Sequence, residues 1–381
     1  MAYSIEEARE KVIAAGLDLL KSGLIARTWG NVSARISDEE FIITPSGRAY
    51  ESLEPADLAV VKIADGSYDQ NGPRPSSEKL LHAYIYGLRP DADFIIHTHQ
   101  NYATALSTMG ETLTVPSEPD AAPEEASRSL LGLRVPTANY GLSGTRQLAK
   151  NVAEALKQNP HSKAVLMKNH GAVIFGRSYE EVFRAAHALE DLAETAYREL
   201  VGRDFPLEVT ERSRAASADS PADLKKYMRF THADIHEENY RWNRVFIRTG
   251  AAVVAECTSP FVLKMSEYGK TVPAYVDDMA QFAGPQVRCL QRGAGDMEAA
   301  RAIGGSPGAV LIKWRGALVA ASSEDEAEAL LMVLEKNCRA ALLAAAGNAP
   351  EKVGTAEGLL EHRFYVKKYS KRKDAVAKKG K

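Results

Sequence analysis

The sequence predicts a layered α/β fold in which one complete domain is followed by a partial second copy. Short apolar runs alternate with longer amphipathic segments, and this alternation of strands and helices is typical of layered α/β domains. Residues 163–196 also resemble residues 308–341 in the order and length of their elements, which are a strand, a turn, a strand and a serine-capped helix. A similarity that recurs within one chain indicates an internal repeat.

Apolar runs bounded by turn residues predict the strands. The expected strands cover residues 41–44, 58–63, 93–99 and 163–168. Segments with apolar residues on one face predict the helices. The expected helices cover residues 4–23, 76–90, 145–158 and 178–200.

Capping signals mark the ends of these helices. Ser4 followed by Glu7 forms a capping box, and Gly23 stands where a C-cap belongs. Two serines open the helix predicted for residues 76–90, and a glycine and a proline close it.

The domain organisation follows from the repeat and from the polar segments. Residues 91–107 resemble residues 249–265, which extends the similarity between the two halves. A segment rich in Ser, Ala, Asp and Pro separates the halves, and the stretch from His362 onward carries nine Lys or Arg residues against one Asp. The predicted parts are a first domain at 1–205, a linker at 206–225, a degenerate repeat at 226–348 and a basic tail at 349–381.

Composition excludes several classes of protein. The chain has 381 residues, 45% of them hydrophobic, and a formal net charge of −2. This balance argues against wholesale disorder, and we expect neither a nucleic-acid partner nor a membrane partner. The three cysteines include no C-x-x-C pair, which argues against a disulfide framework or a cysteine zinc site. The N-terminal segment is acidic, unlike a secretory signal, so we expect a cytoplasmic protein.

The strongest chemical signal is the sequence His97-Thr98-His99 after an apolar run. Residues two apart in a strand point to the same face, so both imidazoles project together. His170 follows another apolar strand, and three histidines from strand ends are a common catalytic zinc set. The alternative for H-x-H alone is a pair of histidines bonded to backbone at a strand edge.

Glu78 supplies a candidate acid beside these histidines. It follows Ser76 and Ser77 at the predicted start of a helix, where hydroxyl and N–H groups can bind a phosphate. The alternative is a capping acid that stabilises the helix dipole. Two Gly-containing turns, 30–33 and 44–47, either complete this phosphate-binding site or simply reverse the direction of the chain.

Taken together, the motifs GNVSAR, ITPSG, RPSSE, HTH, ANYGLSGT and NHG, in this order, resemble the class II aldolase and adducin family. The family includes fuculose-1-phosphate and rhamnulose-1-phosphate aldolases, ribulose-5-phosphate 4-epimerases and the head domain of adducin. The resemblance implies a three-layer α/β/α domain with a central, mostly antiparallel sheet. The partial repeat would share this fold.

The resemblance also implies roles for individual residues. His97, His99 and His170 match the ligands of Zn²⁺, which another divalent metal can replace. Glu78 matches the catalytic acid/base and can also touch the metal, and Tyr140 matches a tyrosine that acts on the aldehyde oxygen. The positions that match the phosphate-binding loops are Gly30, Asn31, Ser46, Gly47, Ser76 and Ser77.

The implied activity is a metal-dependent lyase that cleaves a small phosphorylated ketose into dihydroxyacetone phosphate and an aldehyde. The family's epimerases carry aspartate where Glu78 stands, which favours an aldolase. A 4-epimerase, a sugar-acid phosphate decarboxylase and a metal-free adducin-like scaffold remain alternatives. We expect a homo-oligomer with its site at a subunit or domain interface. The second copy should be silent, because Ala255-Glu256-Cys257 and Trp314-Arg315-Gly316 replace the metal motifs. His82 is interpreted as a packed helix residue.

Overall fold

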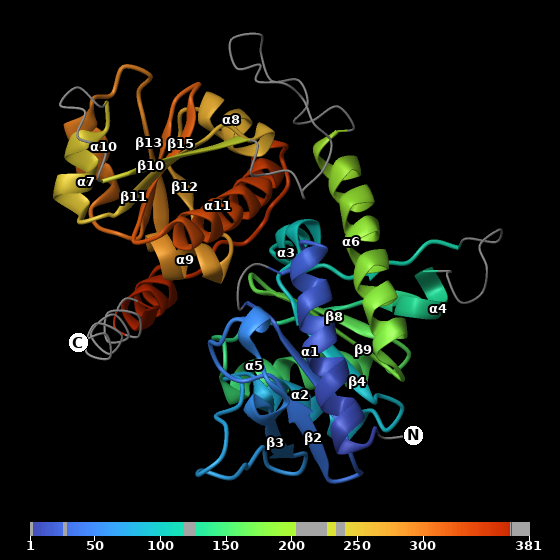
Figure 1. The fold of residues 1–381 in the computed structure, drawn as a ribbon. Coiled ribbons are helices and arrows are strands. Elements are labelled where there is room, and N and C mark those ends of the chain that lie inside the picture. The colour runs from blue at the N-terminus through green and yellow to red at the C-terminus, as the bar shows by residue number, and fades with distance from the viewer. Residues whose placement is uncertain are drawn as a thin grey trace. The chain divides into compact units, whose positions relative to one another are not determined.

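In the computed structural model the chain divides into two units, Met1–Tyr197 and Arg198–Lys381 (Figure 1). The structure describes residues 3–25, 29–117, 127–202, 227–233, 241–365 and 367. The predicted linker, 206–225, lies outside the described residues. No helix in the described part of the chain is long and apolar enough to cross a membrane.

A seven-stranded sheet forms the centre of the first unit, in the order β3-β2-β1-β4-β9-β8-β7. All neighbouring strands are antiparallel except β7 and β8, which are parallel. The strands of this sheet are β1 (Asn31–Arg35), β2 (Glu40–Ile43), β3 (Ala59–Lys62), β4 (Phe94–Thr98), β7 (Thr137–Ala138), β8 (Ala164–Met167) and β9 (Gly171–Gly176). A separate pair consists of β5 (Leu113–Thr114) and β6 (Arg134–Val135).

Helices cover both faces of this sheet. They are α1 (Ile5–Lys21), α2 (Lys79–Leu88), α3 (Asn101–Ser107), α4 (Ser127–Leu131), α5 (Arg146–Gln158) and α6 (Tyr179–Val201), with short 3₁₀ turns at Tyr50–Ser52 and Pro55–Asp57. Helices α2 and α5 pack together over one face, while α1 and α3 contact strands from the other side. The predicted three-layer α/β/α domain with a mostly antiparallel sheet is therefore confirmed.

Burial of the central strands on both faces explains why these elements assemble. Strand β4 is buried along its whole length, and β1 and β9 flank it on both sides. One core, between the sheet and the pair α2 and α5, contains Phe41, Val61, Ile95, Val165 and Val173 from strands and Leu81, Ile85, Leu148 and Val152 from helices. This core fixes strand β4, whose end carries the first histidines, in the centre of the sheet.

The predicted helix ends are partly right. The Ser4–Glu7 capping box is present at α1, and the hydroxyl of Thr145 accepts an N–H at the start of α5. The helix expected from residue 76 begins only at Lys79. The reason is that Ser76 and Ser77 form the turn before the helix, where the Ser76 hydroxyl accepts the N–H of Glu78 at 3.2 Å.

The second unit contains a six-stranded sheet in the order β10-β11-β15-β14-β13-β12. Its strands are β10 (Met228–His232), β11 (Val253–Cys257), β12 (Val272–Pro273), β13 (Gln286–Leu290), β14 (Gly308–Ile312) and β15 (Gly316–Ala321). Its helices are α7 (Asn243–Thr249), α8 (Pro260–Glu267), α9 (Asp277–Ala283), α10 (Asp296–Ile303) and α11 (Glu324–Ala345). Within the predicted tail, residues 355–365 are helical.

The two sheets share a sequence of strand pairings. The order β4-β9-β8-β7 is antiparallel, antiparallel and parallel, and so is the order β11-β15-β14-β13. In each unit the middle hairpin leads into a long helix, α6 or α11. The predicted repeat is compatible with this common order.

The hairpin turns also agree in backbone detail. Asn169 and Trp314 both have positive φ, at 61° and 57°. Two residues later stand Gly171 and Gly316, where an added Cβ would lie 2.3 Å and 2.0 Å from a carbonyl oxygen of the adjacent strand. In each turn the glycine backbone therefore lies directly against the adjacent strand. A residue with a side chain would fit there only if the backbone moved.

Candidate metal centre

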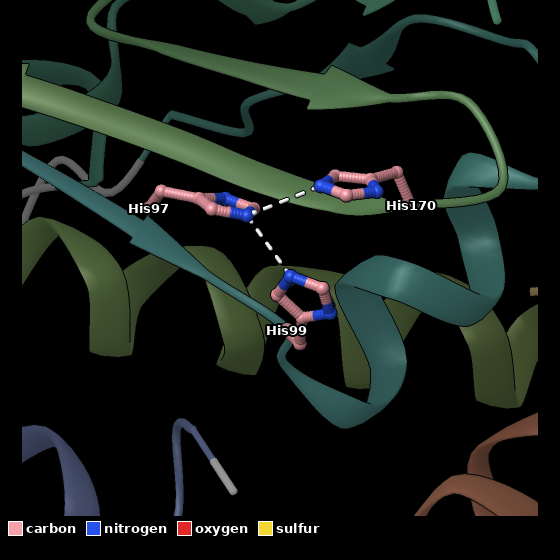
Figure 2. Close-up of side chains that lie close together, drawn as sticks. All are labelled: His97, His99 and His170. Carbon is pink, nitrogen blue, oxygen red and sulfur yellow. Dashed lines mark hydrogen bonds between the residues drawn. The ribbon is translucent and has the colours of Figure 1, made fainter. Parts of the chain in front are cut away.

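Three buried histidines lie together at the end of strand β4 (Figure 2). His97 lies within β4, His99 directly follows it, and His170 lies in the turn between β8 and β9. The Nε2 atom of His97 is 2.9 Å from that of His99 and 3.2 Å from that of His170. The predicted pairing of the H-x-H motif with His170 in space is thus observed.

The tautomer of His97 follows from its backbone contact. Its Nδ1 lies 2.8 Å from the carbonyl oxygen of Ala172, so Nδ1 carries the proton and donates. The Nε2 atom then presents a lone pair to the space between the three rings. A backbone carbonyl that orients a histidine in this way is common at metal sites.

The three ring nitrogens fit a divalent cation. Tetrahedral ligands at ~2.1 Å from a zinc ion lie roughly 3.4 Å from one another, close to the observed separations of the Nε2 atoms. The Nε2 lone pair of His97 also faces a carboxylate oxygen of Glu78 at 3.2 Å, and two such acceptors repel each other unless a proton or a cation lies nearby. The donor set suits zinc and other metals that accept imidazole and carboxylate.

Glu78 stands at the start of α2 with its carboxylate turned toward the histidines. It makes no side-chain cap for the helix, so the capping alternative does not describe its carboxylate. Its Oε1 lies 3.1 Å from Nε2 of His170, and the Ser143 hydroxyl donates to the same oxygen at 3.2 Å. The Asn31 amide donates to Oε2 at 2.8 Å.

Burial and charge set the protonation states of these groups. Burial alone would raise the pKa of Glu78, but the electrostatic influence of His97 and His170 lowers it well below its ordinary value. Burial lowers the pKa of His97 to about 3, although the Glu78 carboxylate opposes this shift. An ionised carboxylate beside a neutral imidazole is the combination that binds a metal.

The predicted phosphate loops lie side by side near this cluster. The N–H of Ser76 donates to the carbonyl of Thr44 at 2.9 Å, and the N–H of Ser46 donates to that of Arg74 at 3.2 Å. The turn that carries Ser46 and Gly47 is therefore joined to the turn that carries Ser76 and Ser77. Their role in phosphate binding stays a prediction.

The other two predicted loop residues begin strand β1. Asn31 pairs with His97 in the sheet, and Gly30 precedes it. Gly30 has a φ of 111°, and an added Cβ would lie 2.6 Å from the carbonyl oxygen of His97. Glycine is thus required for close approach to β4, while the Asn31 side chain is engaged by Glu78.

Tyr140 lies on the loop that follows β7. Asn151 of α5 holds this loop by donating to the carbonyl of Tyr140 at 2.8 Å. Three residues further along, Ser143 donates to Glu78. The loop thus belongs to the site, and the role of the Tyr140 phenol stays a prediction.

Sequence reasoning assigned no role to Ser143 and interpreted His82 as a packed residue. Ser143 lies within the motif ANYGLSGT, so its place there was the available signal. His82 is fully buried beside Phe41, as packing requires, but it is also hydrogen-bonded to Asn31 and Ser33. Both partners lie in β1, so no spacing within α2 could have signalled this second role.

The corresponding positions of the second unit carry different side chains. Strand pairing aligns Glu256 with His97, because each lies opposite the third residue of its partner strand, Leu318 of β15 or Val173 of β9. The residue between the positive-φ position and the glycine is Arg315 instead of His170. In the described part of the second unit, no three His, Cys, Asp or Glu side chains gather as the histidines do.

Comparison with known proteins agrees with this site. Residues 10–197 match the class II aldolase and adducin N-terminal domain. An L-fuculose phosphate aldolase of Escherichia coli strain K12 is 34% identical over 184 residues, which are 48% of this chain and 80% of that protein. The chain belongs to the class II aldolase and adducin family.

Other members of the family carry two kinds of activity in their names. A 5-deoxy-D-ribulose 1-phosphate aldolase of Bacillus thuringiensis is 30% identical over 51% of this chain and 86% of that protein. A probable L-ribulose-5-phosphate 4-epimerase of Mycoplasma pneumoniae is 30% identical over 50% of this chain and 81% of its own length. This class II aldolase family protein therefore resembles both lyases and epimerases in its first unit.

Proposed function

We propose that the first unit is a divalent-metal-dependent aldolase that cleaves a small phosphorylated ketose into dihydroxyacetone phosphate and an aldehyde. The observation that carries the proposal is the Glu78 carboxylate, which lies 3.2 Å and 3.1 Å from Nε2 of two histidines of the triad. A carboxylate at this place can take up or return a proton at a carbon of a substrate held beside the histidines. The names of the relatives support aldol chemistry on sugar phosphates.

His97, His99 and His170 would hold the metal. When bound, a divalent ion supplies Lewis acidity and a positive charge that stabilises a developing oxyanion on the substrate. We assign proton transfer at carbon to Glu78, which Asn31 and Ser143 orient through donated hydrogen bonds.

The loops would bind the rest of the substrate. Ser46, Gly47, Ser76 and Ser77 are assigned to the phosphate together with Gly30 and Asn31. Ser77 is exposed, and Ser46 is half-buried, so both can reach a ligand. The phenol of Tyr140 is assigned the hydroxyl proton of the aldehyde half. A bound phosphate would hold the reacting carbon near Glu78, so that binding also orients the substrate for proton transfer.

Epimerisation is the second candidate, because a relative named as a 4-epimerase matches the same domain. The sequence feature against it is Glu78, where the family's epimerases carry aspartate. Purified protein should be assayed with a panel of ketose 1-phosphates and with ribulose 5-phosphate. Release of dihydroxyacetone phosphate supports the aldolase; interconversion of pentulose phosphates without cleavage would replace it with the epimerase.

We also propose that residues 226–348 are a degenerate copy of the first domain without a metal. The shared strand order, the positive-φ turns and the substitution of Glu256 and Arg315 for two histidines support this proposal. Metal analysis tests it, because one live and one silent domain bind one ion per chain. Two ions per chain would refute it. The homo-oligomer with sites at an interface is part of the same proposal and is tested by measuring mass in solution.

A further inference from the structure

A row of buried polar side chains extends behind Glu78, away from the histidines. The Asn31 amide, which donates to Glu78 at 2.8 Å, contacts Nε2 of His82 through its own oxygen. Nδ1 of His82 lies 2.6 Å from the Ser33 hydroxyl, and that hydroxyl lies 2.9 Å from the hydroxyl of Tyr86. These four side chains are at most 4% exposed.

Two elements supply the row in alternation. Asn31 and Ser33 are two apart in β1 and share one face of the sheet, while His82 and Tyr86 are four apart in α2 and share one face of the helix. Phe41 stacks on the His82 ring, with 6.4 Å between centroids and 15° between planes. The imidazole is thus fixed by packing as well as by hydrogen bonds.

The direction of each hydrogen bond follows from the carboxylate. An ionised Glu78 only accepts, so the Asn31 amide must turn its NH₂ group toward it and its oxygen toward His82. That oxygen only accepts, so Nε2 of His82 must carry a proton. In a neutral imidazole the Nδ1 atom is then an acceptor, which requires Ser33 to donate to it.

The far end of the row completes the assignment. Because the Ser33 hydroxyl donates its hydrogen bond to Nδ1 of His82, its oxygen accepts a hydrogen bond from the Tyr86 hydroxyl. Burial lowers the pKa of His82 to about 3, which keeps the imidazole neutral and the pattern intact at ordinary pH. Every donor in the row therefore points toward Glu78.

We propose that His82 is a positioning residue for the proposed reaction: its Nε2–H tautomer locks the Asn31 amide in the one orientation that donates to Glu78. This inference rests on the proposed function, because it matters to turnover only if Glu78 carries the proton. Without His82, the Asn31 oxygen loses its buried donor. The amide can then rotate and present that oxygen to the carboxylate, which displaces Glu78.

Two substitutions separate positioning from packing. His82→Leu fills the space but removes both ring nitrogens, whereas His82→Gln can donate to Asn31 through its NH₂ and accept from Ser33 through its oxygen. Ile85→Ala, a buried core position of the same helix, controls for lost stability. All variants are prepared as full chains loaded with Zn²⁺.

We expect His82→Leu to retain the metal and the wild-type KM but to lose roughly 10- to 100-fold in kcat, as is typical when support of an active-site ligand is removed. His82→Gln should recover most of this loss, and Ile85→Ala should keep the wild-type kcat. Equal kcat for His82→Leu and the wild type would overturn the inference. So would equal losses in His82→Leu and His82→Gln.

A measurement independent of turnover separates failure of this inference from failure of the proposed function. Nitrogen-15 NMR of histidine-labelled protein reports which ring nitrogen of His82 is protonated, with His82→Gln identifying the signal. We expect the Nε2–H tautomer in metal-free and Zn²⁺-loaded protein. An Nδ1–H tautomer refutes the inference whether or not the protein cleaves a ketose phosphate. The expected tautomer in a protein that cleaves none leaves the positioning of Glu78 supported and the aldolase assignment refuted.

Discussion

Replacement of Glu78 by glutamine tests the assignment of the proton carrier. The carboxamide has the size of the carboxylate, and its oxygen can still accept the Asn31 hydrogen bond of 2.8 Å. Its NH₂ group would face Oγ of Ser143, which can accept. The fold and the three histidines should therefore be preserved, while the group can no longer take up a proton at neutral pH.

The expected loss is that of general acid–base catalysis. Such catalysis typically contributes ~10²- to 10⁴-fold, so kcat should fall by that factor, equivalent to about 3 to 5 kcal/mol of barrier. The assay is release of dihydroxyacetone phosphate, with metal content measured in the same samples. Glu39→Gln, the same change at an exposed acid, serves as the control. A kcat within a few-fold of the wild type, in metal-loaded Glu78→Gln, would refute the assignment.

Three further predictions concern the metal, the glycine contact and pH. His97→Ala should remove metal and activity together, measured by metal analysis and turnover, whereas His161→Ala at an exposed histidine should change neither. Gly171→Ala should destabilise the first unit by about 1 to 3 kcal/mol in chemical unfolding, because the new Cβ would lie 2.3 Å from the Thr98 carbonyl oxygen; Gly293→Ala, where the space is open, should be neutral, and equal effects would contradict the contact. The pKa of His82 is about 3 in the folded chain against 6.5 unfolded, so the unfolded state binds more protons between these values. Its contribution to the free energy of unfolding is therefore present above pH 6.5 and is lost as pH falls toward 3, by up to about 1.4 kcal/mol per pH unit. His82→Gln should flatten the dependence of the unfolding free energy on pH in this range, measured by chemical unfolding.

The sequence was sufficient for features that depend on local periodicity. The rule that residues two apart share a strand face brought His97 and His99 together, and the apolar strand before His170 placed the third histidine at a strand end. The capping box at Ser4 likewise depends on residues three apart, and it forms as predicted. Such features follow from backbone geometry alone.

Features that depend on long-range packing were harder to predict. Ser76 was expected to open a helix, but the turn joins Thr44 of another loop, and this delays the helix to Lys79. The hydrogen-bond role of His82 depends on Asn31, 51 residues away in the chain, and on the pairing of β1 with β4. A pattern of spacings within α2 contains no information about that partner.

The most direct test of the central claim is metal analysis of the purified full chain, with retro-aldol assays on ketose 1-phosphates in the same sample. We predict one divalent ion per chain and release of dihydroxyacetone phosphate from at least one of the ketose 1-phosphates. Protein that binds no divalent ion after loading with Zn²⁺ would contradict the account and favour a scaffold role.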